Sequence, residues 1–192
     1  MINKNRRLTQ NIYEVIVLCT AISFVTKDFY FGRNLDLEYC YDEKITITPR
    51  SYEFDFRNGL SLKKHYAIIG MAYIQEDYPL YYDAVNECGL GVSALNFPDN
   101  AVYRKYDKAM HNIAPFELIP RILCQCGSVD EAAALIDKIN IVDIDFNDSL
   151  KNTHLHWFMA DKNKAITVEP LADGIKVYDN PVGVLTNNPP FD

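Results

Sequence analysis

The order of strand-like and helix-like segments is the feature of this sequence that most restricts its fold. Short β-prone runs of apolar residues fill the first half of the chain and return near its end, while helical patterns occur only between them. Alternating βαβ units would instead place a helix after each strand. The order therefore predicts an α+β layered fold. We expect strands over residues 19–25, 29–33, 45–48, 66–73, 89–97, 155–160, 165–169, 174–178 and 182–186, and helices over residues 115–126 and 129–139.

Local signals connect these elements. Lys27 and Asp28 suit the turn of a hairpin between the first two strands. Ser128 and Glu131 have the spacing of a capping box, in which the hydroxyl and the carboxylate each accept from an exposed amide at a helix start. Residues 78–87, which include three tyrosines and Asp83, resemble an irregular linker. No internal repeat and no break in composition marks a second domain.

Composition and charge exclude several classes of protein. Apolar residues make up 48% of the chain and charged residues 23%, which is the balance of a folded globular protein. No apolar run approaches the ~20 residues that a membrane-spanning helix needs. The formal net charge of −7 disfavours nucleic-acid binding, because nucleic-acid binders usually carry a basic surplus. We therefore expect neither a membrane nor a nucleic acid as partner.

The cysteines and the start of the chain indicate the compartment. The five cysteines are odd in number and include no CxxC pair, which argues against a disulfide framework and favours a reducing cytoplasm. The apolar stretch over residues 12–18 is short and interrupted by Glu14. The residues before Cys19 are not small, as a cleavage site would require, so we do not expect a signal peptide.

Two patterns suggest metal sites only weakly. His154 and His156 lie two apart on an expected strand and could face one side, but no further ligands stand at zinc spacing. Residues 143–147 begin like a calcium loop, but Asp148 stands where Gly is needed and His154 where Glu is needed. Structural histidines and a loop with solvated carboxylates are the simpler interpretations, and no metal or cofactor is expected.

Nucleophilic cysteine chemistry is open from residue types alone. Cys19 or Cys88 could pair with one of the four histidines, but spacing along the sequence does not establish such a pair. A lone cysteine in a strand is more often a small buried apolar residue.

Four motifs, taken in order, carry a family resemblance. They are CTAI at residues 19–22, FGRNLD at 31–36, NECGLG at 86–91 with ALNF at 94–97, and GVLTNNP at 183–189. Each motif alone is weak, but the set in this order and spacing resembles the choloylglycine hydrolase family, in particular bacterial conjugated bile salt hydrolases. The resemblance runs from Cys19 to Asp192.

The resemblance implies a fold and a reaction. The fold would be the αββα sandwich of N-terminal-nucleophile hydrolases, here incomplete at the C-terminus. The first residue of the mature enzyme would be a cysteine whose thiol attacks an amide carbonyl, with its own α-amino group as the base. An α-amino group has a pKa near 7.7–8.0, so it exchanges protons at neutral pH. A thioester intermediate would divide amide cleavage into two easier steps.

The matching motifs also imply catalytic roles. Cys19 would be the nucleophile, with Arg33 beside it favouring the thiolate. Asp36 would orient the α-ammonium group, Asn96 would donate to the oxyanion, and Asn187 would contact the amine of the nucleophile and the reacting amide. The alternative interpretation makes Arg33 and Asp36 a surface ion pair and the two asparagines turn residues.

The substrate site follows from the same resemblance. Leu35, Tyr82, Phe146 and Leu150 would form apolar walls suited to the hydrocarbon face of a bile acid. Penicillin V acylases, which are related, commonly have Tyr at the position of Asn96, so Asn favours a conjugated bile acid as substrate. A penicillin V acylase-like amidase remains the alternative.

Two departures from the family pattern shape the domain prediction. Cys19 is preceded by residues 1–18, which we interpret as an extension from a misassigned start or a propeptide. The chain ends directly after the motif containing Asn187, whereas full-length members continue, so residues 19–192 would be the N-terminal part of the domain. An inactive truncated fragment is thus a further hypothesis. A full-length protein would be expected as a cytoplasmic homotetramer.

Overall fold

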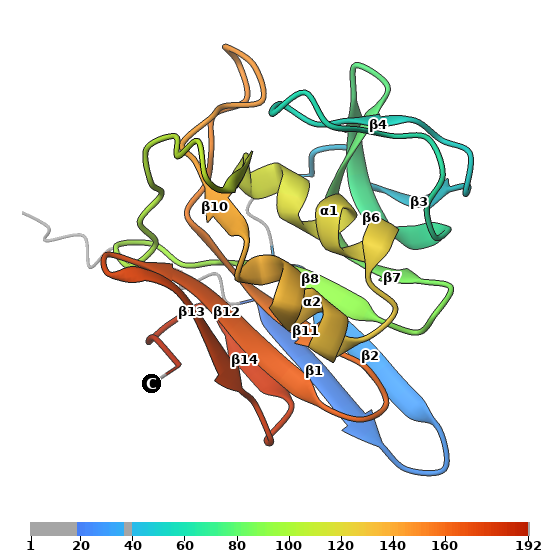
Figure 1. The fold of residues 1–192 in the computed structure, drawn as a ribbon. Helices are drawn as coiled ribbons and strands as arrows, with labels where there is room; N and C mark the ends of the chain where they lie inside the picture. Colours follow the sequence, from blue (N-terminus) through green and yellow to red (C-terminus); the bar gives the residue numbers. More distant parts are fainter. Residues whose placement is uncertain (1–18, 37–39, 192) are drawn as a thin grey trace, which may run out of the picture.

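Two β-sheets stacked face to face, with helices on one outer side, form the architecture of this protein (Figure 1). The computed structural model describes residues 19–36 and 40–191. The larger sheet has seven strands in the order β13-β12-β11-β8-β7-β6-β3, and the smaller has three in the order β14-β1-β2. The predicted extension over residues 1–18 and the apolar stretch within it lie outside the described residues.

The seven-stranded sheet is antiparallel at every pairing. Its strands, in chain order, are β3 (Lys44–Thr48), β6 (Ile68–Gln75), β7 (Tyr78–Asn86), β8 (Gly91–Asn96), β11 (Leu155–Ala160), β12 (Ala165–Leu171) and β13 (Gly174–Asp179). Two short two-stranded sheets flank it, made by β4 (Phe54–Asp55) with β5 (Ser61–Leu62) and by β9 (His111–Ile113) with β10 (Ile139–Ile141).

The three-stranded sheet consists of β1 (Thr20–Val25), β2 (Phe29–Asn34) and β14 (Val184–Thr186). β1 and β2 form the hairpin predicted around Lys27 and Asp28, closed by a hydrogen bond from Thr26 N to Asp28 O. β14 pairs with the other edge of β1, so the two ends of the described chain lie side by side.

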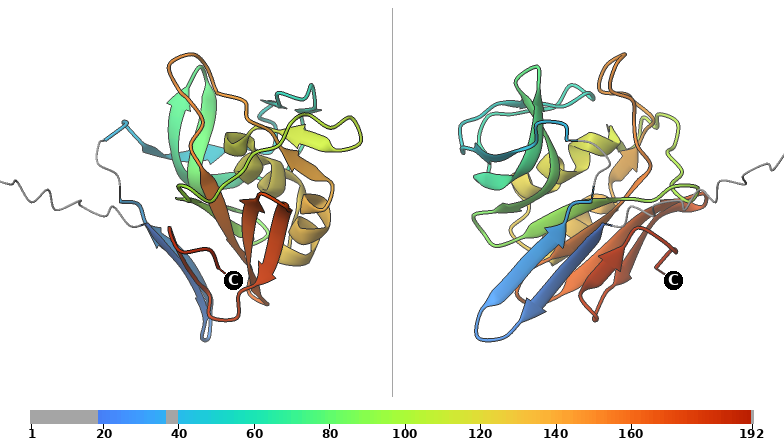
Figure 2. Two further views of the ribbon diagram at one scale, coloured as in Figure 1. Left: turned by 90° about the vertical axis from the view of Figure 1, so that its left-hand side faces the viewer. Right: turned by 180° about the vertical axis from the view of Figure 1, so that it is seen from behind.

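The two helices cover the outer face of the seven-stranded sheet (Figure 2). After a short 3-10 turn at Pro115–Glu117, α1 (Leu118–Gln125) and α2 (Val129–Ile136) pack their apolar side chains onto the sheet. Leu118 and Ile122 of α1 share one buried core with Val92 and Trp157 of the sheet. Burial of such side chains stabilises the fold by roughly 1.5–3 kcal/mol each.

A second core joins the two sheets. Cys19, Ala21 and Leu185 of the smaller sheet meet Leu95 and Phe158 of the larger one. Phe31 of β2 stacks on Phe158 at 6.0 Å. Gly91 permits this approach, because a Cβ at its position would lie 2.7 Å from the Phe31 ring. Helix, sheet and sheet are thus three layers of the four-layer sandwich that the resemblance implies.

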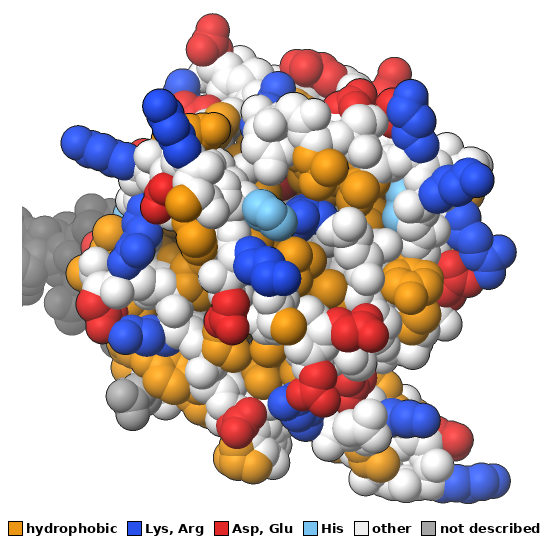
Figure 3. Space-filling view, viewed as in Figure 1, with side chains coloured by type: hydrophobic (Ala, Val, Ile, Leu, Met, Phe, Trp, Pro, Cys, Tyr) orange, Lys and Arg blue, Asp and Glu red, His pale blue; other side chains and the backbone are white. Residues whose placement is uncertain are grey.

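The remaining outer face, on the three-stranded sheet, is apolar and exposed. Ile22 and Phe24 are 39% and 49% exposed, and Phe24 stacks on Tyr30 at 4.9 Å. On the face viewed in Figure 3, by contrast, acidic and basic side chains are interspersed among apolar ones. Among the described helices, none is long and apolar enough to cross a membrane.

The structure corrects the linker prediction for residues 78–87, because Tyr78–Asn86 form the long strand β7 and Glu87 lies in the turn after it. The predicted helix over 129–139 ends at Ile136, and β10 follows. The capping box is half confirmed. Ser128 Oγ accepts from Glu131 N at 3.3 Å, but the Glu131 carboxylate accepts from Gly127 N instead of Ser128 N.

Candidate active site

Cys19 lies at the entry to β1 and faces the seven-stranded sheet. Its side chain is 2% exposed and belongs to the core between the sheets. Side chains alternate along a strand, so Cys19 points to the same side as Ala21. Its Sγ donates to the backbone oxygen of Asp36, 3.8 Å away. The fold therefore buries this thiol within reach of the chain that follows β2.

Pairing within the three-stranded sheet brings distant segments to Cys19. Thr20 lies opposite Asn34 of β2 and opposite Thr186 of β14. Extending each strand pairing by one residue places Cys19 opposite residue 35 on the β2 side and opposite Asn187 on the β14 side. Asn187 is 5% exposed. The first and last motifs of the sequence analysis thus meet across one strand.

Arg33 extends from β2 into the seven-stranded sheet. Its side chain is 4% exposed. Nη1 donates to the carbonyl oxygens of Tyr82, at 3.0 Å, and Ala94, at 2.8 Å, and Nε lies 3.7 Å from Asp83 Oδ2. The alternative interpretation of Arg33 as part of a surface ion pair with Asp36 is therefore wrong.

The backbone pairing of β7 with β8 ends where the Arg33 side chain lies between the two strands. The β7–β8 pairing extends to Asp83 opposite Ser93, and at the next position both carbonyls accept from Arg33 instead. The β6–β7 register shifts at the same point and skips Tyr82, as a β-bulge does. The bulge and the guanidinium together end the ladder beside Cys19.

Burial changes the ionisation of two neighbours of Arg33. It raises the pKa of Asp83, an effect that the nearby guanidinium opposes. Burial also raises the pKa of Tyr82 to about 12, with the acidic Glu43 adding to it. The Tyr82 hydroxyl is therefore protonated at neutral pH and available as a hydrogen-bond donor.

A pocket of about 440 Å³ opens at this point. Its size suits a small organic ligand, and aliphatic and aromatic side chains supply much of its wall. Seven of the nine residues predicted from the resemblance line it: Cys19, Arg33, Leu35, Tyr82, Asn96, Phe146 and Leu150. Asn96 ends β8, opposite Leu155 of β11. The pocket does not include Asp36, which is exposed, or Asn187.

The loop over residues 142–154 supplies one wall. Phe146 is 8% exposed and packs edge-on against Phe116 at 5.3 Å. Arg57 lies over the Phe146 ring at 5.2 Å and donates from Nη2 to its carbonyl oxygen at 2.8 Å. Phe146 N donates to Leu150 O, which closes the loop and keeps both side chains at the pocket.

Several residues that line the pocket are not predicted from the sequence. Tyr73, Leu80, Tyr81 and Phe116 also face the pocket. Three of these positions lie in β6 or β7, and β7 is the segment that the sequence predicts as a linker. Alternating burial along β7 reverses at the bulge, so its period-two pattern is broken where the pocket lies.

The weak metal patterns have other contacts. His156 is fully buried and its Nδ1 lies 3.1 Å from Glu169 Oε1, whereas His154 is exposed. Asp145 pairs with Lys151 at 2.9 Å and accepts from Asn152 N. In residues 19–36 and 40–191, no three His, Cys, Asp or Glu side chains are grouped as metal ligands would be.

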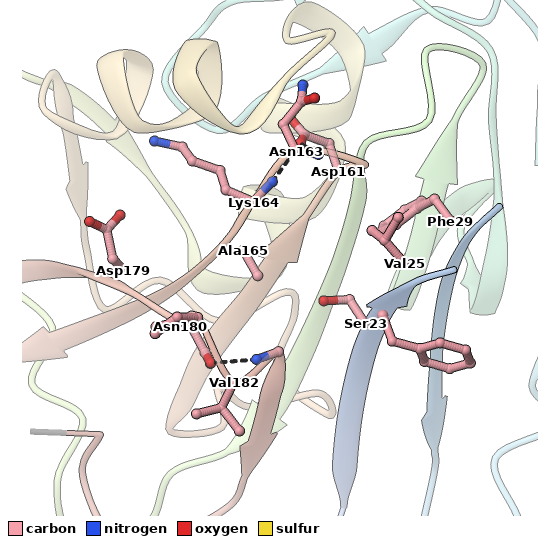
Figure 4. Close-up of a pocket in the computed structure, with 13 residues that line it drawn as sticks. Ser23, Val25, Phe29, Asp161, Asn163, Lys164, Ala165, Asp179, Asn180 and Val182 are labelled. Carbon is pink, nitrogen blue, oxygen red and sulfur yellow. Dashed lines mark hydrogen bonds between the residues drawn. The ribbon is translucent and has the colours of Figure 1, made fainter. Parts of the chain in front are cut away.

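A larger depression, of about 790 Å³, lies at the opposite end of the sandwich (Figure 4). There Ser23 and Phe29 face Asp161 and Asn180 across the gap between the sheets. The polar groups are engaged in the fold. Asp161 accepts from the backbone N–H groups of Val129, Asn163 and Lys164, and Asn180 accepts from Gly183 N.

Comparison with known proteins gives a consistent result. The chain matches the choloylglycine hydrolase family of linear amide C–N hydrolases over residues 19–192. A bile salt hydrolase/transferase of Lactiplantibacillus plantarum is 53% identical over 175 residues, which are 91% of this chain and 54% of that protein. The chain therefore spans about half the length of the curated relatives it matches.

Solved structures agree with this match. The crystal structure of a variant of conjugated bile acid hydrolase from Clostridium perfringens superposes with a TM-score of 0.85 at 38% identity, covering 91% of this chain and 55% of that one. Penicillin V acylase from Agrobacterium tumefaciens superposes with a TM-score of 0.75 at 20% identity, covering 91% of this chain and 54% of that one, and shows the fold alone. This chain belongs to the choloylglycine hydrolase family and carries part of its N-terminal-nucleophile fold.

Proposed function

We propose that this protein cleaves the amide bond of glycine- or taurine-conjugated bile acids, with Cys19 as nucleophile. The observation that carries the proposal is the buried Cys19 thiol at an apolar 440 Å³ pocket that Arg33 and Asn96 also line. The relatives support the choice of substrate, since the 53% identical protein is a bile salt hydrolase/transferase.

The residues around Cys19 divide the reaction into two steps. The thiolate attacks the amide carbonyl, Asn96 donates to the oxyanion, and the Cys19 α-amino group passes the thiol proton to the departing amine of glycine or taurine. Water then hydrolyses the thioester and releases the bile acid. The positive charge of Arg33 favours the thiolate, Asp36 orients the α-ammonium, and Asn187 contacts the amine.

The pocket walls supply binding. Leu35, Phe146 and Leu150 contact the hydrocarbon face of the steroid, and the protonated Tyr82 hydroxyl offers one hydrogen-bond donor. Burial of an apolar ligand face against such walls contributes about 25 cal/mol per Å² before the costs of association.

The chemistry requires a free α-amino group on Cys19. While residue 18 is joined to Cys19, that nitrogen is an amide, which neither ionises nor accepts a proton. We therefore propose that residues 1–18 stand outside the catalytic unit and are absent from, or removed in, the active protein. Residues 19–192 would form the N-terminal part of the catalytic domain.

Comparing two forms of the chain tests the proposal. One is the chain as given, and the other replaces residues 1–18 by a single methionine that aminopeptidase removes. Each is incubated with glycocholate, taurocholate and penicillin V, and the released amine is quantified. We expect amine release from a bile salt only by molecules that begin at Cys19, and an intact-mass measurement shows which molecules of each form do so. Turnover by molecules that still carry residues 1–18 would contradict the N-terminal-nucleophile mechanism.

A penicillin V acylase-like amidase is the second candidate. The likeness to the Agrobacterium enzyme concerns the fold, and faster cleavage of penicillin V than of either bile salt would favour this candidate. Absence of turnover with all three substrates would favour an inactive fragment. We further propose that the full-length protein is a cytoplasmic homotetramer, as the family resemblance implies, and light scattering after size exclusion would test the assembly.

A further inference from the structure

A fully buried pair, His156 and Glu169, lies between the two sheets. Both side chains have zero exposure, and His156 Nδ1 is 3.1 Å from Glu169 Oε1. His156 and Phe158 lie two residues apart in β11, so their side chains point to the same face of the sheet. Phe158 belongs to the core between the sheets, so His156 faces that core as well. Glu169 shares its face with Ala165 of the same core.

This pair contacts both segments that carry the asparagines of the proposed site. The His156 ring stacks on Phe97, the residue after Asn96, at 4.2 Å and an interplanar angle of 9°. Glu169 Oε1 accepts from Phe191 N at 3.0 Å, in the segment that follows Asn187. A third contact joins the same two segments, because Asn100 Nδ2 donates to Asn188 Oδ1 at 2.9 Å.

The pair is not explained as core packing. Buried ionisable side chains are costly, and apolar residues of similar volume often stabilise a fold as well or better. Among the described residues, His156 Nε2 and Glu169 Oε2 have no hydrogen-bond partner, so the pair does not satisfy its own polar atoms. What the carboxylate supplies is an acceptor for a loop amide at a place where β14 has already ended.

We propose that His156 and Glu169 are positioning residues that hold the Asn96–Phe97 and 187–191 segments in register at Cys19. Glu169 fixes the second segment through Phe191 N, and His156 fixes the first through Phe97 while holding the carboxylate in place. The proposal rests on the proposed function for the roles of Asn96 and Asn187. A small displacement of such groups is enough to slow a reaction without changing substrate binding by the pocket walls.

Four variants of the chain that begins at Cys19 separate positioning from general stability. Glu169→Leu removes the acceptor, Glu169→Gln restores an acceptor oxygen, and His156→Phe keeps the ring stack but loses the bond to Glu169. Asp161→Leu is the matched control. It removes another buried carboxylate that accepts backbone N–H groups, at the opposite end of the sandwich.

A loss of positioning should lower kcat and leave KM nearly unchanged. We expect Glu169→Leu to lower kcat for glycocholate about 10-fold to 100-fold with KM changed less than about 3-fold, because the pocket walls remain. We expect His156→Phe to lower kcat about 3-fold to 10-fold, and Glu169→Gln and Asp161→Leu to stay within about 3-fold of the parent. Equal kcat losses in Glu169→Leu and Asp161→Leu would overturn the proposal. If Glu169→Leu does not fold, the kcat values of His156→Phe and Glu169→Gln are compared instead. Equal kcat values for these two variants would overturn the proposal.

Hydrogen exchange provides a readout that does not need turnover. Glu169→Leu should speed exchange of the Phe191 and Asn187 backbone amides at least about 10-fold beyond the change in Asp161→Leu, since exchange reports local opening. If the parent protein turns over no substrate, the proposed function fails, while this exchange difference still judges the positioning role. Unchanged exchange at both amides would overturn the positioning role as well.

Discussion

The two ends of the sandwich differ in how their polar groups are used. At the end away from Cys19, the depression is larger, about 790 Å³, but Asp161 and Asn180 are engaged with backbone groups of adjoining turns. At the Cys19 end, the pocket is about 440 Å³, and its polar residues extend from interrupted or ending strands. Where the β7–β8 ladder stops, Arg33 enters and binds the remaining carbonyls, and Asn96 at the end of β8 lines the pocket, so volume alone does not identify a site.

Replacing Cys19 by Ser gives the largest expected difference between the ends. In a chain that begins at residue 19, Cys19→Ser should lower kcat for bile salt cleavage at least about 10³-fold, because serine is a much weaker nucleophile than a thiolate. Ser23→Ala, at the far-end depression, is the control and should stay within about 3-fold of the parent. Amine release is the measurement. Comparable rates for Cys19→Ser and the parent would place the nucleophile elsewhere.

Removing Arg33 should affect both activity and stability. Arg33→Met leaves the carbonyls of Tyr82 and Ala94 and the carboxyl of Asp83 without their partner. We expect the free energy of unfolding, measured in urea, to fall by about 2–4 kcal/mol and kcat to fall about 100-fold. Lys164→Met at the far end, where the side chain is 40% exposed and its ammonium pairs with Asp130, should change neither by much.

Shortening Leu150 tests the apolar wall by itself. Leu150→Ala should raise KM for glycocholate about 3-fold to 10-fold and leave kcat nearly unchanged, because the lost methyl groups contact bound substrate and transition state alike. Val182→Ala, at an exposed position of the far-end depression, is the matched truncation and should have no effect on KM. A fall in kcat without a change in KM would contradict a binding role for Leu150.

The smallest effect concerns the pH dependence of stability at Asp83. Its pKa is raised by burial, so the folded protein holds the proton more tightly than the unfolded chain does. The contribution of this group to stability therefore declines as pH rises from about 4 through the raised pKa. Asp83→Asn should remove that decline, which urea unfolding at a series of pH values would detect. A steeper decline in the variant would contradict the direction of the shift.

Much of the fold could be predicted from periodicity, and the exceptions have physical reasons. The β1–β2 hairpin and strand β11 followed from β-prone runs between turn residues. Strand β7 was missed because the bulge at Tyr82 shifts its buried positions by one residue, which removes the alternation that identifies a strand.

Part of the site could be predicted from the sequence. The motifs indicated Cys19, Arg33 and Asn96, which do line one pocket. Sequence alone could not show that Arg33 binds two backbone carbonyls rather than Asp36, because those contacts depend on where the β7–β8 ladder ends. Nor could it show the His156–Glu169 pair, whose members meet only through sheet register.

The most direct test of the central claim is to find the acyl group on the protein. The chain that begins at Cys19 is mixed with glycocholate, quenched in acid, digested and mapped by mass spectrometry. We predict a cholyl thioester on Cys19, formed as glycine is released, and none on the exposed Cys40 or Cys88. Glycine release with an adduct on another cysteine, or with none on Cys19 when quenched during turnover at several times, would contradict Cys19 as the nucleophile.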